Sequence, residues 1–168
     1  ATEVLRDADI AMYRAKHRGG NSFEFSDADM HKRAFDRLDL EGQIRHGLSA
    51  GEFRLVYQPI VDMKRDCAVV GFEALVRWQH PSRGLLAPAS FIALAEETGL
   101  IVPLGRWVLE ESVRQAREWR ERHGDGTDAG PLRINVNLSP CQLTHPGLVQ
   151  DMVDILERVG VAPDSLCL

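Results

Sequence analysis

A carboxylate and a guanidinium lie on the same side of a predicted strand, and they are the first candidates for chemistry. Residues 68–78 form a mostly apolar run, and within it Glu73 and Arg77 are four residues apart, so they share one face of an extended chain. Such a run is typical of a sheet covered on both sides, where charged groups are costly unless paired or used. Along the strand the two groups are ~13 Å apart, too far for a direct ion pair. Two interpretations stay open: functional groups, or structural charges that pair with other partners.

A second polar face occurs in residues 132–138. Asn137 lies at the end of this predicted strand, where the side chains of barrel enzymes meet their substrates. Its amide oxygen is a suitable ligand for a hard cation such as Mg²⁺. The alternative interpretation is an asparagine that caps the following loop. The residues alternate along this strand between an apolar face (Leu132, Ile134, Val136, Leu138) and a polar face (Arg133, Asn135, Asn137).

Alternating strands and helices must position these groups. Apolar periodicity predicts a helix over 31–50, a strand over 53–57 that ends at Pro59, and the strand over 68–78. Helices over 88–97 and 104–122, the strand over 132–138, a helix over 148–159 and a strand from 165 follow. In the helix over 148–159 one apolar stripe is expected, made of Leu148, Val149, Met152, Val153 and Leu156. From residue 68 onward this order predicts a parallel sheet with right-handed crossovers.

Length and composition restrict the class of protein. The chain has 168 residues, 44% hydrophobic and 27% charged, which is typical of a globular domain. A net charge of −5 argues against binding of a nucleic acid polymer. The three cysteines are far apart and form no Cys-x-x-Cys, so neither a disulfide framework nor a zinc site is expected. No apolar run approaches the roughly 18 residues of a membrane span.

Several other residues are interpreted structurally. His80 belongs to a turn and lacks a second histidine at ligand spacing. Trp107 and Trp119 are expected in the core, and the pairs Glu96-Glu97 and Glu110-Glu111 on a solvated helix surface. An eight-stranded barrel needs ~250 residues, and the residues from Phe53 onward are about half of that number. We therefore expect this sequence to be a truncated piece of a longer chain.

Four motifs, in order and in register, resemble EAL domains over residues 38–168. They are Tyr57-Gln58-Pro59-Ile60, Glu73-Ala74-Leu75-Val76-Arg77-Trp78, Phe91-Ile92 with Ala95-Glu96-Glu97-Thr98-Gly99-Leu100-Ile101, and Asn137-Leu138-Ser139. One departure is Pro140-Cys141, where Ala-Arg is common in the family. The resemblance implies an α/β fold, the first half of a modified (β/α)8 TIM-type barrel. It also implies hydrolysis of cyclic-di-GMP to the linear dinucleotide, assisted by Mg²⁺ or Mn²⁺.

The same resemblance assigns roles to residues. Glu73 corresponds to the signature metal ligand and is the expected catalytic residue, and Asn137 corresponds to a second metal ligand. Arg77 and Gln58 correspond to substrate-binding residues, Arg77 at a phosphate and Gln58 in the ligand pocket. The family's further acidic ligands and its catalytic lysine would follow Leu168, so we expect this chain alone to be inactive.

The N-terminal stretch resembles a different family. Residues 7–16 are similar to the closing helix of GGDEF diguanylate cyclase domains, which are α+β, and a helix over 3–18 with a short strand over 22–25 agrees with this. Gly20 stands where that family usually has a phosphate-binding arginine. The expected organisation is therefore a GGDEF tail over 1–25, a linker over 26–37 and a truncated EAL domain over 38–168.

Two alternatives to the enzyme are open. A catalytically degenerate EAL domain would bind cyclic-di-GMP as a regulatory module, and an unrelated α/β barrel fragment would have only a structural likeness. The retained Glu73 and Asn137 favour the enzyme over the first alternative. For the complete parent we expect a homodimer in the cytoplasm, with a membrane anchor in a preceding region as an option.

Overall fold

The computed structural model describes residues 9, 12–13, 16–17, 28–124 and 132–168. The chain divides into two compact units, Ala1–Gln43 and Ile44–Leu168. In the first unit the described residues between 9 and 17 are helical, as expected for the helix over 3–18. The predicted strand over 22–25 lies outside the described residues.

The connection between the predicted domains is helical. Helix α2 (Ala28–Ala50) contains the predicted helix over 31–50 and begins three residues before it, inside the predicted linker over 26–37. The predicted helix over 31–50 is therefore confirmed, and the predicted boundaries of the linker stay a prediction. The helix is followed by Gly51, whose φ of 68° is a left-handed conformation that suits glycine.

A mixed sheet forms the centre of the second unit. Its strands are β1 (Phe53–Asp62), β2 (Ala68–His80), β3 (Gly84–Leu86), β4 (Arg133–Val136) and β5 (Leu166–Cys167). The order is β1-β2-β4-β5, with β3 paired to β2. Strands β2, β4 and β5 are parallel, as predicted, whereas β1 and β3 run antiparallel to β2. The α/β class is therefore confirmed, with a mixed rather than purely parallel sheet.

Strand lengths differ from the prediction in instructive ways. β1 does not end at Pro59 but continues to Asp62, with Pro59 opposite Phe72. Within the described sheet β1 is an edge strand, where a residue without an N–H is tolerated. β2 is longer than predicted and β4 is shorter, so that Asn137 follows β4 instead of ending it.

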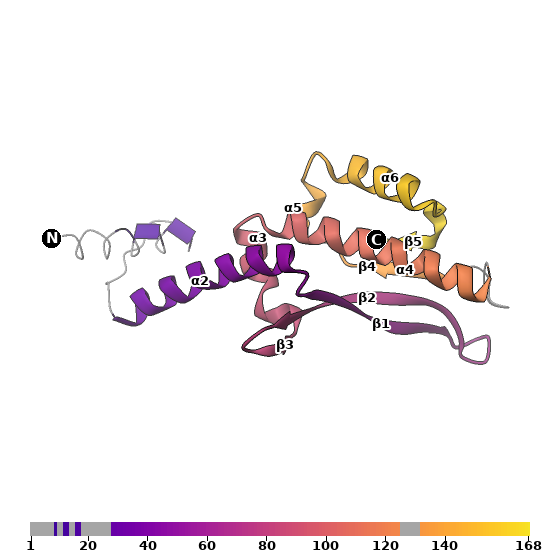
Figure 1. The fold of residues 1–168 in the computed structure, drawn as a ribbon, viewed down its shortest axis with the longest axis horizontal. Coiled ribbons are helices and arrows are strands. Elements are labelled where there is room, and N and C mark those ends of the chain that lie inside the picture. The colour runs from indigo at the N-terminus through magenta and orange to yellow at the C-terminus, as the bar shows by residue number, and fades with distance from the viewer. Residues whose placement is uncertain (1–8, 10–11, 14–15, 18–27, 125–131) are drawn as a thin grey trace. The chain divides into compact units, whose positions relative to one another are not determined.

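Helices pack on one face of this sheet (Figure 1). They are the short helix η1 (Pro88–Ser90), α3 (Ile92–Glu97), α4 (Ile101–His123), α5 (Pro140–Leu143), α6 (Leu148–Val159) and η2 (Pro163–Ser165). Phe91 divides the predicted helix over 88–97 into η1 and α3. α4 packs on β1 and β4, and α6 packs on α4. No helix within the described ranges is long and apolar enough to cross a membrane.

An aromatic cluster fills the space between the sheet and the helices. Phe53 stacks on Trp78 with ring centroids 5.3 Å apart, and Phe91 meets Trp78 edge-on at 5.7 Å. Trp119 contacts Tyr57 and Phe72 with centroid distances of 4.9 and 4.5 Å but is only half-buried, so its predicted place in the core is confirmed in part. Such rings supply much of the buried apolar area that stabilises a domain of this size.

One predicted apolar stripe was partly wrong. On α6 the fully buried residue is Ile155, whereas Val149 and Val153 are 71% and 40% exposed. In the described chain α6 packs on α4, so the apolar residues of α6 that point away from α4 are exposed. Periodicity alone does not show which side of a wide apolar stripe meets that layer.

Candidate functional site

Glu73 and Asn137 meet on the polar side of the sheet. Glu73 is in the middle of β2, and the parallel pairing places it beside Asn135 of β4, two residues before Asn137. The amide Nδ2 of Asn137 donates a hydrogen bond of 2.6 Å to Oε1 of Glu73. Glu73 is half-buried and Asn137 is exposed. The structure therefore brings together the two expected metal ligands, which are 64 residues apart in sequence.

Gln58 lies next to this pair. In the antiparallel register of β1 and β2 it is directly opposite Glu73, and directly opposite residues share a face of the sheet. Its side chain is exposed and has no hydrogen-bond partner among the described residues. Gln58, Glu73 and Asn137 thus form one group, available to a ligand on this face.

Arg77 is on the same face but apart from this group. It follows Glu73 by four residues, and its Nη1 donates a 2.8 Å hydrogen bond to the carbonyl of Val76. Its neighbour across the strands is Arg54, which is not among the predicted site residues. Arg54 and Gln58 on β1 are four residues apart, as are Glu73 and Arg77 on β2. This shared spacing could have indicated from the sequence that Arg54 and Gln58 lie on one face of their strand.

Among the described residues the sheet is covered on one face only, which corrects the expectation of two-sided burial. The residues of β1 that point away from the helices, Arg54, Val56 and Gln58, are exposed, and so is Gln79 of β2. Glu73 and Arg77 are consequently half-buried rather than buried within the described chain. The cost of desolvating their charges is correspondingly small here.

A short helix fixes the backbone after Asn137. Ser139 caps α5 in a capping box: its hydroxyl accepts from the N–H of Gln142, and Oε1 of Gln142 accepts from the N–H of Ser139 at 3.1 Å. Pro140 takes the first helical position, where no N–H is needed. The unusual Pro140-Cys141 pair is therefore compatible with an ordered turn. The Ser-x-x-Gln spacing could have predicted this helix from sequence.

Helix α4 supports α5 through one close contact. Gln142 is 4% exposed, and a Cβ on Gly105 of α4 would overlap its amide group. Glycine at this position lets the two helices approach each other. The position of the loop that carries Asn137 therefore depends on a residue of α4.

The donor set is suitable for a hard divalent cation. A carboxylate and a carboxamide oxygen are the ligands that Mg²⁺ and Mn²⁺ prefer, and rotation of the Asn137 amide by about 180° turns its oxygen toward Glu73. Within the described residues no group of three or more His, Cys, Asp or Glu could hold a metal ion. Glu73 and Asn137 thus fit two positions of the oxygen shell that such a cation takes.

A cavity of about 330 Å³ adjoins Asn137 on the helix side of the sheet. Its lining is mostly apolar and includes Val76, Ile92, Leu104 and Glu96. Glu96 was expected on a solvated surface, but it lines this cavity and is half-buried. The short helix α3 packs against α4, and Glu96 near the end of α3 therefore faces the cavity.

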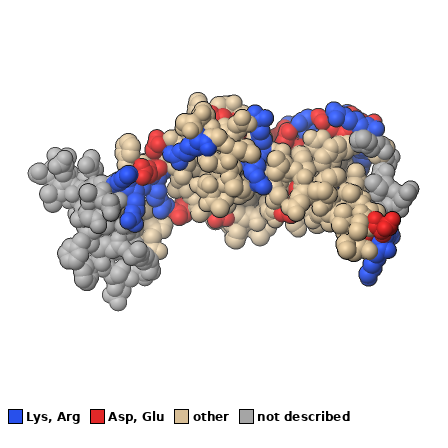
Figure 2. All heavy atoms as spheres, turned by 90° about the horizontal axis from the view of Figure 1, so that it is seen from below, with Lys and Arg blue, Asp and Glu red and all other residues tan. Residues whose placement is uncertain are grey.

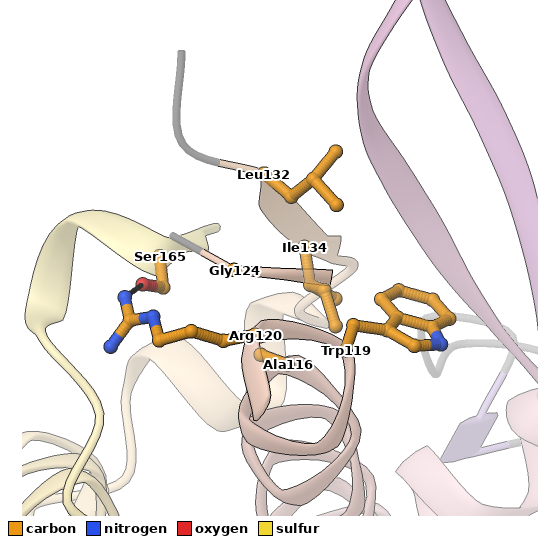
Figure 3. A pocket seen from close by; sticks show the side chains of 7 residues that line it. All are labelled: Ala116, Trp119, Arg120, Gly124, Leu132, Ile134 and Ser165. Atoms are coloured by element: carbon orange, nitrogen blue, oxygen red, sulfur yellow. Dashed lines mark hydrogen bonds between the residues drawn. The ribbon is translucent and has the colours of Figure 1, made fainter. Parts of the chain in front are cut away.

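A small cavity of about 20 Å³, room for about one water molecule, lies at the opposite end of β4 (Figure 3). Arg120 of α4 donates a hydrogen bond from Nη2 to the hydroxyl of Ser165 at 2.9 Å. Ile134 and Trp119 form the apolar wall of this small cavity. We interpret the packing at this end as structural. In barrels of parallel strands, the N-terminal ends of the strands contribute to stability and the C-terminal ends carry the active site.

His80 has a structural role, as expected. It is 5% exposed, and its Nδ1 accepts hydrogen bonds from the N–H groups of Ser82 and Arg83 at 3.2 and 3.3 Å. These contacts hold the turn between β2 and β3. The ring also lies 4.9 Å from that of Trp78.

The face of the molecule shown in Figure 2 is largely uncharged. Lys and Arg occur there in small groups, several of them beside Asp or Glu, and no continuous basic tract crosses the described surface in this view. A binder of nucleic acid polymers usually presents a basic stripe.

Comparisons with known proteins agree on one family. The profile of the EAL domain matches residues 41–168. The bifunctional diguanylate cyclase/cyclic di-GMP phosphodiesterase MucR of Pseudomonas aeruginosa is 42% identical over 166 residues, which cover 99% of this chain and 23% of that protein. The cyclic di-GMP phosphodiesterase PdeR of Escherichia coli is 40% identical over 160 residues, covering 95% of this chain and 23% of that protein. The chain thus spans under a quarter of these relatives.

Solved structures give the same result. The PaMucR phosphodiesterase in its c-di-GMP complex is 40% identical with a TM-score of 0.68, over 76% of this chain and 49% of that one. The FimX EAL domain from Pseudomonas aeruginosa bound to c-di-GMP is 27% identical with a TM-score of 0.65, over 76% of this chain and 48% of that one. The profile match includes every strand of the described sheet and both residues of the Glu73–Asn137 pair. The chain therefore belongs to the EAL domain family.

Proposed function

We propose that this chain is part of a longer signalling protein that hydrolyses cyclic-di-GMP to the linear dinucleotide. The observation that carries the proposal is the direct contact of Glu73 with Asn137, two hard-oxygen donors on the open face of the sheet. Similarity to the phosphodiesterases MucR and PdeR supports the same substrate. The open face fits the first half of a modified (β/α)8 barrel whose interior is completed by later strands.

The four predicted site residues each have a proposed task. Glu73 and the amide oxygen of Asn137 would hold Mg²⁺ or Mn²⁺, and a cation there would supply positive charge beside the phosphate and a water molecule of lowered pKa. Arg77 binds a phosphate oxygen through its guanidinium, which has donors left beyond the one bonded to Val76. Gln58, opposite Glu73, hydrogen-bonds the ligand and fixes its orientation.

We also infer the organisation of the longer protein. Residues 1–25 would be the tail of a GGDEF domain and 38–168 the first half of the EAL domain, joined by a helical connection. The alignment with bifunctional MucR, which extends over 99% of this chain, supports this arrangement.

The test uses the full-length protein with cyclic-di-GMP and Mn²⁺. We expect the linear dinucleotide as product, and no product when EDTA removes the metal. Glu73→Gln keeps the size of the side chain but removes its charge, and we expect it to lower turnover by more than about 100-fold, since changes next to metal ligands already cost ~10–100-fold.

Glu157→Gln is the matched control, because Glu157 is exposed on α6 and has no partner among the described residues. It should leave turnover unchanged. If the wild type binds cyclic-di-GMP but makes no linear product, the chain belongs to a regulatory binding module, and the proposed hydrolysis is wrong.

A further inference from the structure

Two arginines face each other on the open side of the sheet. Arg54 of β1 and Arg77 of β2 are directly opposite in the antiparallel register, so their side chains leave the same face a few ångströms apart. Like charges in this arrangement repel each other and destabilise a strand pair. Because the Arg54–Arg77 pair does not stabilise the sheet, we expect a functional reason for it.

Neither arginine is neutralised by the described chain. Arg54 is exposed and has no hydrogen bond or ion pair with any described residue. Arg77 makes only the hydrogen bond to the carbonyl of Val76, and Glu73 is four residues away along β2. Most of the N–H donors of the two guanidinium groups are therefore available to an external anion.

The chemistry of the pair selects the kind of anion. Guanidinium groups form planar, charge-assisted hydrogen bonds with phosphate oxygens, and two of them can each engage one non-bridging oxygen of a phosphodiester. The pair is ~13 Å along the strands from the opposed Gln58 and Glu73. A ligand with two phosphodiester groups can reach both places with the help of the long arginine side chains.

We propose that Arg54 joins Arg77 in a two-arginine site that binds one phosphodiester group of the cyclic dinucleotide. Arg54 is then a substrate-binding residue that the motifs do not include. The identity of the ligand rests on the proposed function, whereas the anion site itself rests on the register and on the lack of carboxylate partners.

The first measurement is cyclic-di-GMP binding to the full-length protein in EDTA, so that hydrolysis does not interfere. Arg54→Gln should raise the Kd by about 10-fold or more, the effect of losing a charge-assisted phosphate contact. In turnover assays the same variant should raise KM and leave kcat nearly unchanged. Arg54→Lys, which keeps the charge but not the planar fork, should fall between wild type and Arg54→Gln.

Thermal unfolding gives a second, opposite readout. Without ligand, Arg54→Gln should raise the Tm because it removes the repulsion with Arg77, while the Tm increase caused by cyclic-di-GMP should shrink. A residue with only a structural role would lower the Tm when replaced. Arg122→Gln removes the same charge from the far end of α4 and should leave the Kd unchanged.

Two failures can be told apart. If wild type neither binds nor hydrolyses cyclic-di-GMP, the proposed function is wrong, and millimolar pyrophosphate then probes the anion site: it should raise the Tm of wild type more than that of Arg54→Gln. If wild type binds the dinucleotide and Arg54→Gln binds it equally well, the proposed function stands and the two-arginine site is overturned.

Discussion

The two faces of the β1–β2 pair are built from alternating residues of the same two strands, but they have different properties. The face toward α4 presents Phe53, Tyr57, Phe72 and Trp78, whose rings contact one another and the helices. The other face presents Arg54, Gln58, Glu73 and Arg77, with no aromatic residue among them. Because the side-chain period of a strand is two, one sequence can specify a core and a site at once.

This comparison teaches where a substitution should act. A substitution that removes packing from the helix-covered face should lower stability. A change on the open face removes a polar group that contacts no core residue, so it should alter binding or turnover instead. The following predictions test that division in the full-length protein, from the largest expected effect to the smallest.

Trp78→Ala should have the largest effect on stability. The side chain is 0% exposed, packs on Phe53 and donates from Nε1 to Glu52 at 2.9 Å. We expect a loss of ~3–5 kcal/mol in the free energy of unfolding, measured by denaturant titration of the transition that includes this domain. Gln79→Ala, at the exposed neighbouring position, should change it by less than about 0.5 kcal/mol. Equal losses in the two variants would contradict the division between the faces.

Arg77→Ala should separate ligand binding from metal binding. Loss of a charge-assisted phosphate contact should cost ~1.5–3 kcal/mol in affinity for cyclic-di-GMP. The affinity for Mn²⁺, measured in the absence of nucleotide, should stay as in wild type, and the unfolding free energy should rise slightly because the repulsion with Arg54 is removed. A variant that lost Mn²⁺ affinity alone would show that Arg77 supports the metal ligands and not the phosphate.

Gly105→Ala should connect the helical layer to the site. The added methyl group overlaps the amide of Gln142, so either α5 moves or α4 and α5 separate. Overpacking of this kind typically costs ~1–3 kcal/mol of stability. Because α5 follows Asn137 directly, we also expect weaker Mn²⁺ binding. Gly42→Ala is a suitable control, since a Cβ there meets nothing within 4 Å; unchanged Mn²⁺ affinity in Gly105→Ala would show that the two layers are not coupled.

Tyr57→Phe should have the smallest effect, and a stabilising one. The buried hydroxyl of Tyr57 has no hydrogen-bond partner within the described chain, so its removal should raise the unfolding free energy by up to about 1 kcal/mol. Burial, with a contribution from the Glu111 carboxylate, raises the pKa of this phenol above its ordinary value of 10.0.

The same shift predicts a pH dependence. The folded state holds the phenolic proton more tightly than the unfolded state, so this contribution to stability is complete below pH 10 and decreases as the pH rises above it. Stability of the wild type should therefore fall above pH 10 more steeply than that of Tyr57→Phe. Parallel pH curves for the two proteins would show that the phenol is solvated when folded.

Much of this organisation could be predicted from the sequence. Alternation in residues 53–58, 68–78 and 132–138 identified the strands and assigned Glu73, Arg77 and Asn137 to polar faces. The four motifs identified the EAL domain, which the profile match confirmed. These properties are encoded locally, because side-chain direction in a strand depends only on position along the chain.

The tertiary structure alone decided which residues are neighbours. Strand register is a long-range property, so the sequence could not show that Arg54 is opposite Arg77 or that Gln58 is opposite Glu73. Nor could it show that Asn137 reaches Glu73, since this contact depends on the parallel pairing of β2 with β4 across the whole α3–α4 connection. The extension of β1 through Pro59 and the inward position of Glu96 have the same cause, because an edge position and a cavity exist only once the elements have packed together.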